Sequence, residues 1–504
     1  MTHEIDETFR ALPLARMADA ALSRAQELGV EHADVRVERI RTDSFTLRDA
    51  RMQSSHDDDE RGLSVRVVHD GTWGFAASAD LSPDTATKLV EQAIEIARAS
   101  APVNTERIEL APEPSYGEVT WVSAYDVDPF SVHENERIAL LEGWSRQLLA
   151  AQEVSHTDAT LRQVKENKFY ADLAGTMTTQ QRVRVQCEVT ATWVDEHSGR
   201  FETMRTLAPP VGRGWEHLTG PSSWDWEGEL AQLPAMLAEK AAAPSVKAGR
   251  YDLVIDPSNL WLTIHESIGH ATELDRALGY EANYAGTSFA TPDKLNVLAY
   301  GSPVMHVTGD RQAEHGLATV GWDDEGVEAQ TWDLVRDGQF VGYQLDRHIA
   351  ARTGAARSNG CAFADSPFHV PIQRMANVSL QPSRAGDASL DDLIGGVDDG
   401  IYIVGDKSWS IDMQRYNFQF TGQRFYRIRS GRLDGMLRDV AYQATTTDFW
   451  GAMEAVGGPS TYVLGGAFNC GKGQPGQTAP VSHGCPVALF RGIRILNTVE
   501  EAGS

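Results

Sequence analysis

The stretch RYDLVIDPSNLWLTIHESIGHATELDRALGY, Arg250 to Tyr280, separates two parts of this 504-residue sequence that differ in character. It predicts a short strand followed by a helix. Before it, amphipathic helices alternate with strands, whereas after residue 295 short strands with Gly and Asp turns prevail. The sequence therefore predicts an α+β protein with two domains, residues 1–240 and residues 241–504, and places this helix in the second domain.

The N-terminal part predicts helices packed on antiparallel sheets. Residues 13–29 have apolar side chains at helical spacing, residues 33–55 alternate as a strand does, and Asp70-Gly71 marks a hairpin turn. A further amphipathic helix, 135–152, precedes another alternating region. Sliding the chain by about 124 positions sets the second region on the first, which suggests an internal duplication.

The C-terminal part predicts a β-rich domain. Turns at Asp337-Gly338 and Ser430-Gly431 lie between alternating segments and are typical of antiparallel hairpins. Such an array favours a barrel-like or sandwich-like domain that carries the helix of the opening stretch.

Composition excludes several classes of partner. The formal net charge is −26, with a pI near 4.9, and both nucleic acid and anionic membranes favour the opposite sign. The first residues lack the pattern of a signal peptide, and no apolar run approaches the roughly 20 residues of a transmembrane helix. Four dispersed cysteines do not form a disulfide framework. We therefore expect a cytoplasmic protein that binds neither nucleic acid nor membrane.

The helix carries His265, Glu266 and His270 as H-E-x-x-x-H, one residue longer than the H-E-x-x-H of zinc peptidases. In a regular helix, residues five apart point about 140° away from each other, which is poor for sharing an ion. A π turn would return both histidines to one face, and Gly269 would tolerate the distortion. The spacing predicts a π-like turn near Ile268-Gly269; otherwise the histidines simply form hydrogen bonds at a domain boundary.

A zinc site also needs a third protein ligand and a position left for water. Glu273, Asp275 and Glu281 are the nearby candidates. The distant candidates are histidines and cysteines, namely His315, Cys361, Cys470, His483 and Cys485. Cys470 lies in a glycine-rich segment, but spacing alone does not choose it over Glu273.

Several motifs resemble the TldD/PmbA metallopeptidases, a family once named modulators of DNA gyrase. They are GLSVRVVHDGTWGFAASADLS, HESIGHATELD, GWDDEG, PIQRMANVSL, DFWGAMEAVGG and NCGKGQP, and the HESIGH and NCGKGQP pieces are those of the TldD-like branch. The resemblance implies a zinc peptidase with one Zn²⁺ per active chain. His265, His270 and Cys470 would be its ligands, and Glu266 would be the catalytic carboxylate. His483 and Cys485 have no place in the motif.

The expected reaction is hydrolysis of extended peptides. Glu266 would move the proton of a metal-activated water, and His483, Tyr284 or backbone amides around Gly471 would supply a second donor for the oxyanion. A sheet edge beside the site would accept a peptide as an added strand. The resemblance implies unfolded peptides or small proteins as substrates, and a homodimer or a heterodimer with a PmbA-like sister chain. The alternatives are a non-catalytic binding or assembly subunit of such a complex and a zinc amidohydrolase acting on a non-peptide substrate.

Overall fold

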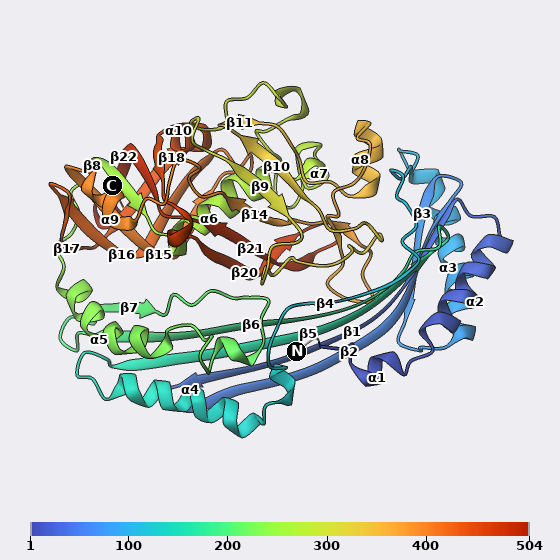
Figure 1. Ribbon diagram of the computed structural model, residues 1–504, viewed down its shortest axis with the longest axis horizontal. Coiled ribbons are helices and arrows are strands. Elements are labelled where there is room, and N and C mark those ends of the chain that lie inside the picture. The colour runs from blue at the N-terminus through green and yellow to red at the C-terminus, as the bar shows by residue number, and fades with distance from the viewer. Residues whose placement is uncertain (1–2, 502–504) are drawn as a thin grey trace.

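A long, curved seven-stranded sheet from the N-terminal half forms the base of the molecule in Figure 1, and the β-rich C-terminal half lies on its concave side. The structure is a computed structural model that describes residues 3–501. The strand order is β3-β2-β1-β5-β6-β4, and β7 pairs with β6. Helices cover the convex face of the sheet, whereas the C-terminal half covers the concave face.

The N-terminal half repeats one unit of helix, three antiparallel strands and helix. The first unit comprises α2 (Leu14–Glu27), β1 (His32–Arg48), β2 (Arg51–His69), β3 (Thr72–Ser78) and α3 (Pro83–Ser100). The second comprises α4 (Glu134–Leu149), β5 (His156–Asp172), β6 (Met177–Val194), β7 (Phe201–Arg205) and α5 (Trp226–Ala242). Outside the units lie α1 (Glu7–Arg10) and β4 (Glu118–Val122). The repeated order and pairing confirm the duplication suggested by the sequence.

The two units meet where β1 pairs with β5. Asp34 lies opposite Asp172 at one end, and Arg48 lies opposite Asp158 at the other. A shift of about 124 residues sets Asp34 on Asp158 and Arg48 on Asp172. The two pairs therefore contain the same two positions of the repeated unit, as expected if an approximate two-fold axis lies between β1 and β5.

Alternation along β1 separates an apolar face from a charged face. Val35, Val37 and Phe45 are buried in the clusters formed with the helices. Arg36 and Glu38 point to the opposite face, yet they are only 2% and 0% exposed. The C-terminal half therefore covers a sheet surface that is rich in charge.

Acidic residues of the loop 322–326 compensate that charge. The Arg66 guanidinium lies 2.7 Å from the Asp34 carboxylate and 2.9 Å from that of Glu325. Lys168 Nζ lies 2.7 Å from the Asp324 carboxylate. Buried charges need such partners, so these ion pairs fix how the halves fit together.

The C-terminal half is built around a closed five-stranded barrel, which confirms the predicted β-rich domain. Its strands are β8 (Gly249–Ile255), β15 (Asp399–Ile411), β16 (Asn417–Arg429), β18 (Val440–Thr445) and β22 (Ala488–Asn497). Closure occurs because β15 pairs with β8 in parallel and with β16 in antiparallel fashion. Two further strands, β17 (Arg432–Leu437) and β19 (Met453–Val456), extend this sheet.

Smaller sheets and short helices surround the barrel. The strands are β9 (Val307–Asp310), β10 (Thr331–Arg336), β11 (Gln339–Phe340), β12 (Ala362–Phe363), β13 (Ile372–Gln373), β14 (Asn377–Leu380), β20 (Val463–Lys472) and β21 (Gln477–Cys485). The helices are α6 (Pro257–Ile264), α7 (Leu274–Ala277), α8 (Arg347–Thr353), α9 (Leu390–Gly395), α10 (Thr446–Gly451) and α11 (Thr498–Glu501). Of these, α6 contacts β15 of the barrel as well as β20 and β21.

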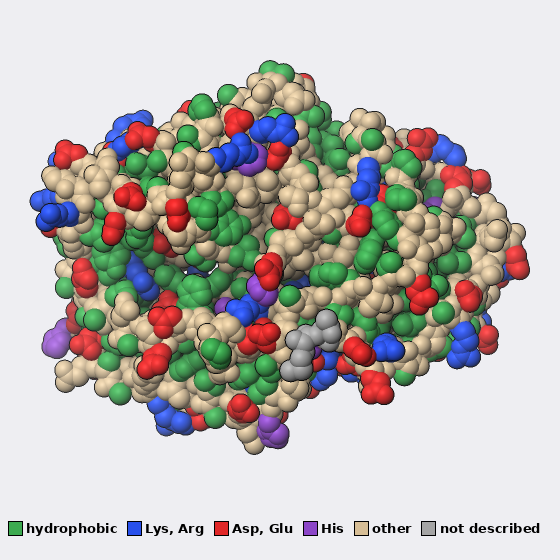
Figure 2. Space-filling model, viewed as in Figure 1, with side chains coloured by type: hydrophobic (Ala, Val, Ile, Leu, Met, Phe, Trp, Pro, Cys, Tyr) green, Lys and Arg blue, Asp and Glu red, His purple; other side chains and the backbone are tan. Residues whose placement is uncertain are grey.

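The predicted domain boundary at residue 240 falls in the last turn of α5, and it stays a prediction. Within residues 3–501, no helix combines the length and apolar character needed to cross a bilayer. Figure 2 shows acidic and basic side chains interspersed over one face of the molecule.

Candidate metal centre

The helix of the opening stretch changes its winding at the first histidine. Regular α-helix ends at Ile264, and His265–Gly269 forms a π turn in which the His270 N–H donates to the His265 carbonyl oxygen. The π turn predicted from the spacing is confirmed. It brings the His265 and His270 rings to a centroid separation of 4.7 Å, on the same side of the helix.

Two side chains from distant segments and one from the next helical turn satisfy the carbonyl groups around the π turn. The Tyr300 hydroxyl donates to the Ser267 carbonyl oxygen at 2.5 Å, and Gln344 Nε2 donates to that of Gly269 at 2.7 Å. Thr272 Oγ1 donates to the Ile268 carbonyl oxygen at 2.9 Å. A buried backbone carbonyl is costly to leave unpaired, so these three donors support the unusual turn.

Gly269 serves this turn for a reason other than the predicted one. Its φ of −52° and ψ of −61° are accessible to any residue, so backbone freedom is not what the site requires. A Cβ at this position would lie 2.5 Å from Met375 Sδ. The glycine therefore permits close packing against Met375.

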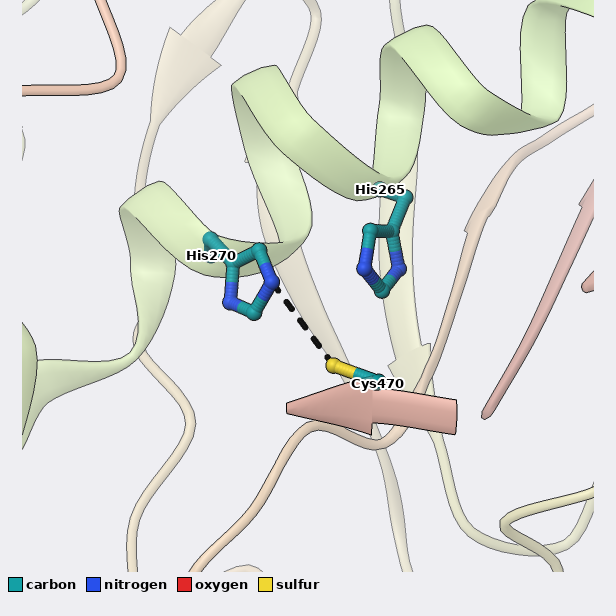
Figure 3. A group of neighbouring side chains, drawn as sticks. All are labelled: His265, His270 and Cys470. Carbon is teal, nitrogen blue, oxygen red and sulfur yellow. Dashed lines mark hydrogen bonds between the residues drawn. The ribbon is translucent and has the colours of Figure 1, made fainter. Parts of the chain in front are cut away.

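Three candidate ligands converge below the π turn (Figure 3). One donor atom from each of His265, His270 and Cys470 lies within 4.8 Å of the others. The distance from His270 Nε2 to Cys470 Sγ is 3.6 Å. Cys470 comes from β20, directly after an irregularity that follows Ala467 in the pairing with β21. Such a bulge redirects a side chain, here toward the two histidines.

The donor set fits a zinc ion. Zinc bonds of about 2.0–2.1 Å to nitrogen and 2.3 Å to sulfur place a nitrogen and a sulfur ligand of a tetrahedral site about 3.6 Å apart, which is the distance between His270 Nε2 and Cys470 Sγ. Burial raises the pKa of the Cys470 thiol, but the positive charges of His265 and Arg374 outweigh burial and lower that pKa below its usual value. This favours the thiolate, which is the form that binds metal.

An ion cluster behind the site orients His270. His270 Nδ1 lies 2.8 Å from the Glu273 carboxylate, so its Nε2 is the nitrogen presented to Cys470. Burial raises the pKa of Glu273, yet Lys472 and His270 together lower it well below its usual range. Lys472 also contacts Asp275 and, at 3.6 Å, Glu281. These three carboxylates, each a predicted ligand candidate, thus lie around a lysine.

His265 has a different partner. Its Nδ1 lies 2.7 Å from Nε2 of His483, and His483 Nδ1 lies 2.8 Å from the Val378 carbonyl oxygen. Burial and the neighbouring His265 lower the pKa of His483 well below its usual value. His483 is fully buried with both nitrogens engaged, which leaves it unable to act as the oxyanion donor suggested from the sequence.

Glu266 has a partner that sequence reasoning missed. Arg415 Nη1 lies 2.6 Å from a carboxylate oxygen of Glu266, although 149 residues separate them. Both residues line a cavity of about 740 Å³ together with the three converging side chains. The walls also include Arg205 and Trp224 of the N-terminal half, so the cavity lies between the two halves.

The other predicted candidates lie elsewhere. Cys485 Sγ lies 3.7 Å from the Pro257 carbonyl oxygen, and Cys361 Sγ contacts the Asn359 side chain. His315 contacts the Gly212 carbonyl oxygen, and Tyr284 is 56% exposed. Gly471 does line the cavity.

A mixed α+β fold with three converging nitrogen and sulfur donors beside a carboxylate is typical of metal-dependent hydrolases. A family model described as the PmbA/TldA metallopeptidase C-terminal domain matches residues 248–497, and the model of domain 1 matches residues 33–97. Together the matches cover more than half of the chain, which belongs to the PmbA/TldD metallopeptidase family.

Relatives are similar over nearly their whole length. A metalloprotease of Methanocaldococcus jannaschii is 25% identical over 92% of this chain and 96% of its own. A zinc metalloprotease TldD homolog of Saccharolobus solfataricus is 25% identical over 94% of this chain and 98% of its own.

Two solved structures share the fold. A candidate modulator of DNA gyrase from Thermotoga maritima has a TM-score of 0.74 at 14% identity, covering 96% of this chain and 100% of that one. TldE from Thermococcus kodakarensis has a TM-score of 0.68 at 16% identity, covering 95% and 99%.

Proposed function

We propose that this protein is a zinc-dependent peptidase that hydrolyses unfolded or extended peptides. One observation carries the proposal: the donor atoms of His265, His270 and Cys470 lie within 4.8 Å of one another beside Glu266, on the wall of a cavity. In this proposal the three residues hold one Zn²⁺ and Glu266 is the catalytic carboxylate.

Zinc bound there would supply Lewis acidity toward a water molecule and the scissile carbonyl group. Glu266 would accept a proton from the attacking water as the new C–O bond forms. The same carboxyl would then give the proton to the leaving amine nitrogen as the C–N bond breaks. Arg415 holds one Glu266 oxygen at 2.6 Å, which keeps this carboxylate oriented toward the cavity.

The substrate would bind as an extended strand. Residues from Gly465 to Gly471 of β20 line the cavity, and β20 has only β21 as its partner in a two-stranded sheet of the described chain. Addition of a peptide to such an edge uses main-chain hydrogen bonds and therefore tolerates many sequences. Enclosure between the halves favours unfolded chains over folded proteins.

We further propose a cytoplasmic protein that works as a homodimer or with a PmbA-like sister chain. The four cysteines are buried and unpaired, as a reducing compartment favours. The likeness to TldE supports a sister of the same fold. Mass photometry of the protein alone and mixed with such a sister would distinguish the two assemblies.

The test combines metal analysis with peptide cleavage. We expect purified protein to contain about one zinc per active chain and to cleave an unfolded peptide, with activity lost to a chelator and restored by zinc. Cys470→Ala should lose the metal, with Cys361→Ala as the control for removal of a buried thiol elsewhere. Full zinc occupancy in Cys470→Ala would contradict the ligand assignment.

Two other outcomes would replace the proposal. Protein that takes up no zinc and binds peptides without cleaving them would be a binding or assembly subunit. Protein that holds zinc and hydrolyses small amides but leaves peptides intact would be an amidohydrolase.

A further inference from the structure

His483 connects the candidate metal centre to the backbone of a neighbouring strand. It lies on β21, is 0% exposed, and stands between the Val378 carbonyl oxygen and the ring of His265. Its ring is stacked with that of Trp261, at a centroid separation of 6.2 Å and an interplanar angle of 15°. The family resemblance gave this residue no role.

The hydrogen-bond chain determines which nitrogen of each ring carries a hydrogen toward its neighbour. A backbone carbonyl oxygen can only accept, so the His483 nitrogen that faces Val378, Nδ1, carries the hydrogen. In a neutral imidazole the other nitrogen is then an acceptor, so His483 Nε2 must receive a hydrogen from His265 Nδ1. A charged His483 could reverse this second bond, but an unpaired cation with no solvent exposure is strongly disfavoured.

The consequence falls on the opposite side of the His265 ring. When His265 is neutral, its hydrogen is on Nδ1 and its Nε2 is unprotonated, which is the form of imidazole that binds a metal. The reversed bond would place a hydrogen on His265 Nε2 and block it. Glu273, at 2.8 Å from His270 Nδ1, favours the same state in His270 over the longer contact of 3.2 Å from the donor-only Arg276 guanidinium. The two histidines thus share a tautomer, one set by an anion and the other by a neutral histidine.

We propose that His483 is a positioning residue that selects the Nδ1–H tautomer of His265 and thereby presents His265 Nε2 as a zinc ligand. This inference rests on the proposed function in one respect, the identity of the metal. The tautomer itself is a property of the metal-free protein. Because the partner of His483 is a backbone carbonyl, substitutions elsewhere in β14 leave the relay in place.

The first experiment measures the tautomer without metal. In metal-free protein labelled with nitrogen-15 histidine, long-range nitrogen–proton spectra identify which ring nitrogen bears the hydrogen. Comparison with His265→Gln assigns the signals. At a pH at which the His265 ring is neutral, we expect its hydrogen on Nδ1 in the wild type and a mixture of tautomers in His483→Phe. A neutral wild-type His265 with its hydrogen on Nε2 would overturn the inference.

The second experiment measures zinc affinity by competition with a chromogenic chelator. His483→Phe keeps an aromatic ring but has no acceptor, so its zinc affinity should fall about 10–100-fold. His483→Gln retains an amide oxygen that can accept from His265, and it should restore most of that loss. His483→Phe that folds and binds zinc as tightly as the wild type would refute a role in metal binding.

The two readouts separate the possible failures. If the wild type binds no zinc, the proposed function is wrong, whereas the nitrogen spectra still decide the tautomer. If His483→Phe does not fold, as judged by its thermal unfolding, the wild-type spectra and the His483→Gln affinity decide the inference. An affinity in folded His483→Gln as low as in a His265→Gln control would contradict the acceptor role.

Discussion

Two buried groups of polar side chains in this protein are organised in opposite ways. At the interface between the halves, a cation such as Arg66 lies between two carboxylates, those of Asp34 and Glu325, and the charges neutralise one another. At the candidate metal centre, His270 Nε2 and Cys470 Sγ face each other at 3.6 Å, and Nδ1 of each histidine contacts a supporting side chain.

The difference separates a structural role from a functional one. Paired opposite charges fix how the two halves fit together. Removal of one charged side chain leaves its partner buried without a counter-charge. Donor atoms that converge from separate elements instead form a site whose partner must come from outside. Mutations in the first group should therefore affect stability, and mutations in the second should affect metal binding or reaction rate.

The largest expected effect is on the rate. Glu266→Gln removes the proposed proton acceptor while keeping the size of the side chain, so kcat should fall about 10²–10⁴-fold with zinc content unchanged. Peptide cleavage and metal analysis on the same preparation measure both quantities. Glu328→Gln, at a half-exposed carboxylate, is the matched control. Loss of zinc in Glu266→Gln would show that this residue supports the metal rather than the proton transfer.

Mutations at the interface between the halves should instead lower stability and leave zinc binding unchanged. Arg66→Met leaves Asp34 and Glu325 buried without their cation, so the free energy of unfolding should fall by about 3–5 kcal/mol. Urea unfolding measures this change, and zinc per folded molecule should stay constant. Arg10→Met removes an exposed ion pair with Glu4 and should cost less than about 1 kcal/mol. Equal losses in the two variants would contradict the role of burial.

Acid should weaken the interface by a smaller amount. Burial raises the pKa of Asp34, but Arg66 and His32 outweigh it and lower the pKa to about 2, from 3.8 for an ordinary aspartate. Because the folded-state pKa is depressed, this stabilisation of about 2 kcal/mol is present above pH 4 and is lost as the pH falls toward 2. Unfolding curves at pH 5, 4 and 3 should follow this loss, whereas in Asp34→Asn this component should be absent.

The smallest effect concerns the π turn. Tyr300→Phe removes the donor to the Ser267 carbonyl oxygen and should cost about 1 kcal/mol, together with a measurable fall in zinc affinity. Tyr343→Phe removes a similar buried hydrogen bond, to the Ala290 carbonyl oxygen, away from the turn. It should lower stability alike and leave zinc affinity unchanged. A similar fall in zinc affinity in both variants would mean that the hydrogen bond from Tyr300 has no specific role in supporting the π turn.

Local features of this protein could be predicted from its sequence. The spacing of His265 and His270 required a π turn if both were to face one ion, and that turn is present. Asp70-Gly71 and Ser430-Gly431 marked hairpins because both residues of each pair adopt positive φ angles there. Alternation marked the long strands, and a shift of about 124 residues marked the duplication.

Tertiary structure decided how distant residues meet. Cys470 lies 200 residues from His270, and Arg415 lies 149 residues from Glu266, so no periodicity or spacing relates either pair. Spacing alone left Cys470 and Glu273 as equal candidates, and only the family resemblance favoured Cys470. Folding placed the Cys470 thiol beside His270 Nε2 and the Glu273 carboxylate behind the same ring, at Nδ1.

The sequence by itself therefore determined what short-range geometry controls: the winding of the helix, the turns, and the alternation of side chains along each strand. Only the tertiary structure decided which distant side chains complete the site and which tautomer His265 adopts. The physical reason is that burial and hydrogen-bond pairing depend on contacts between elements far apart in the chain, such as His483 with His265, which lies 218 residues away.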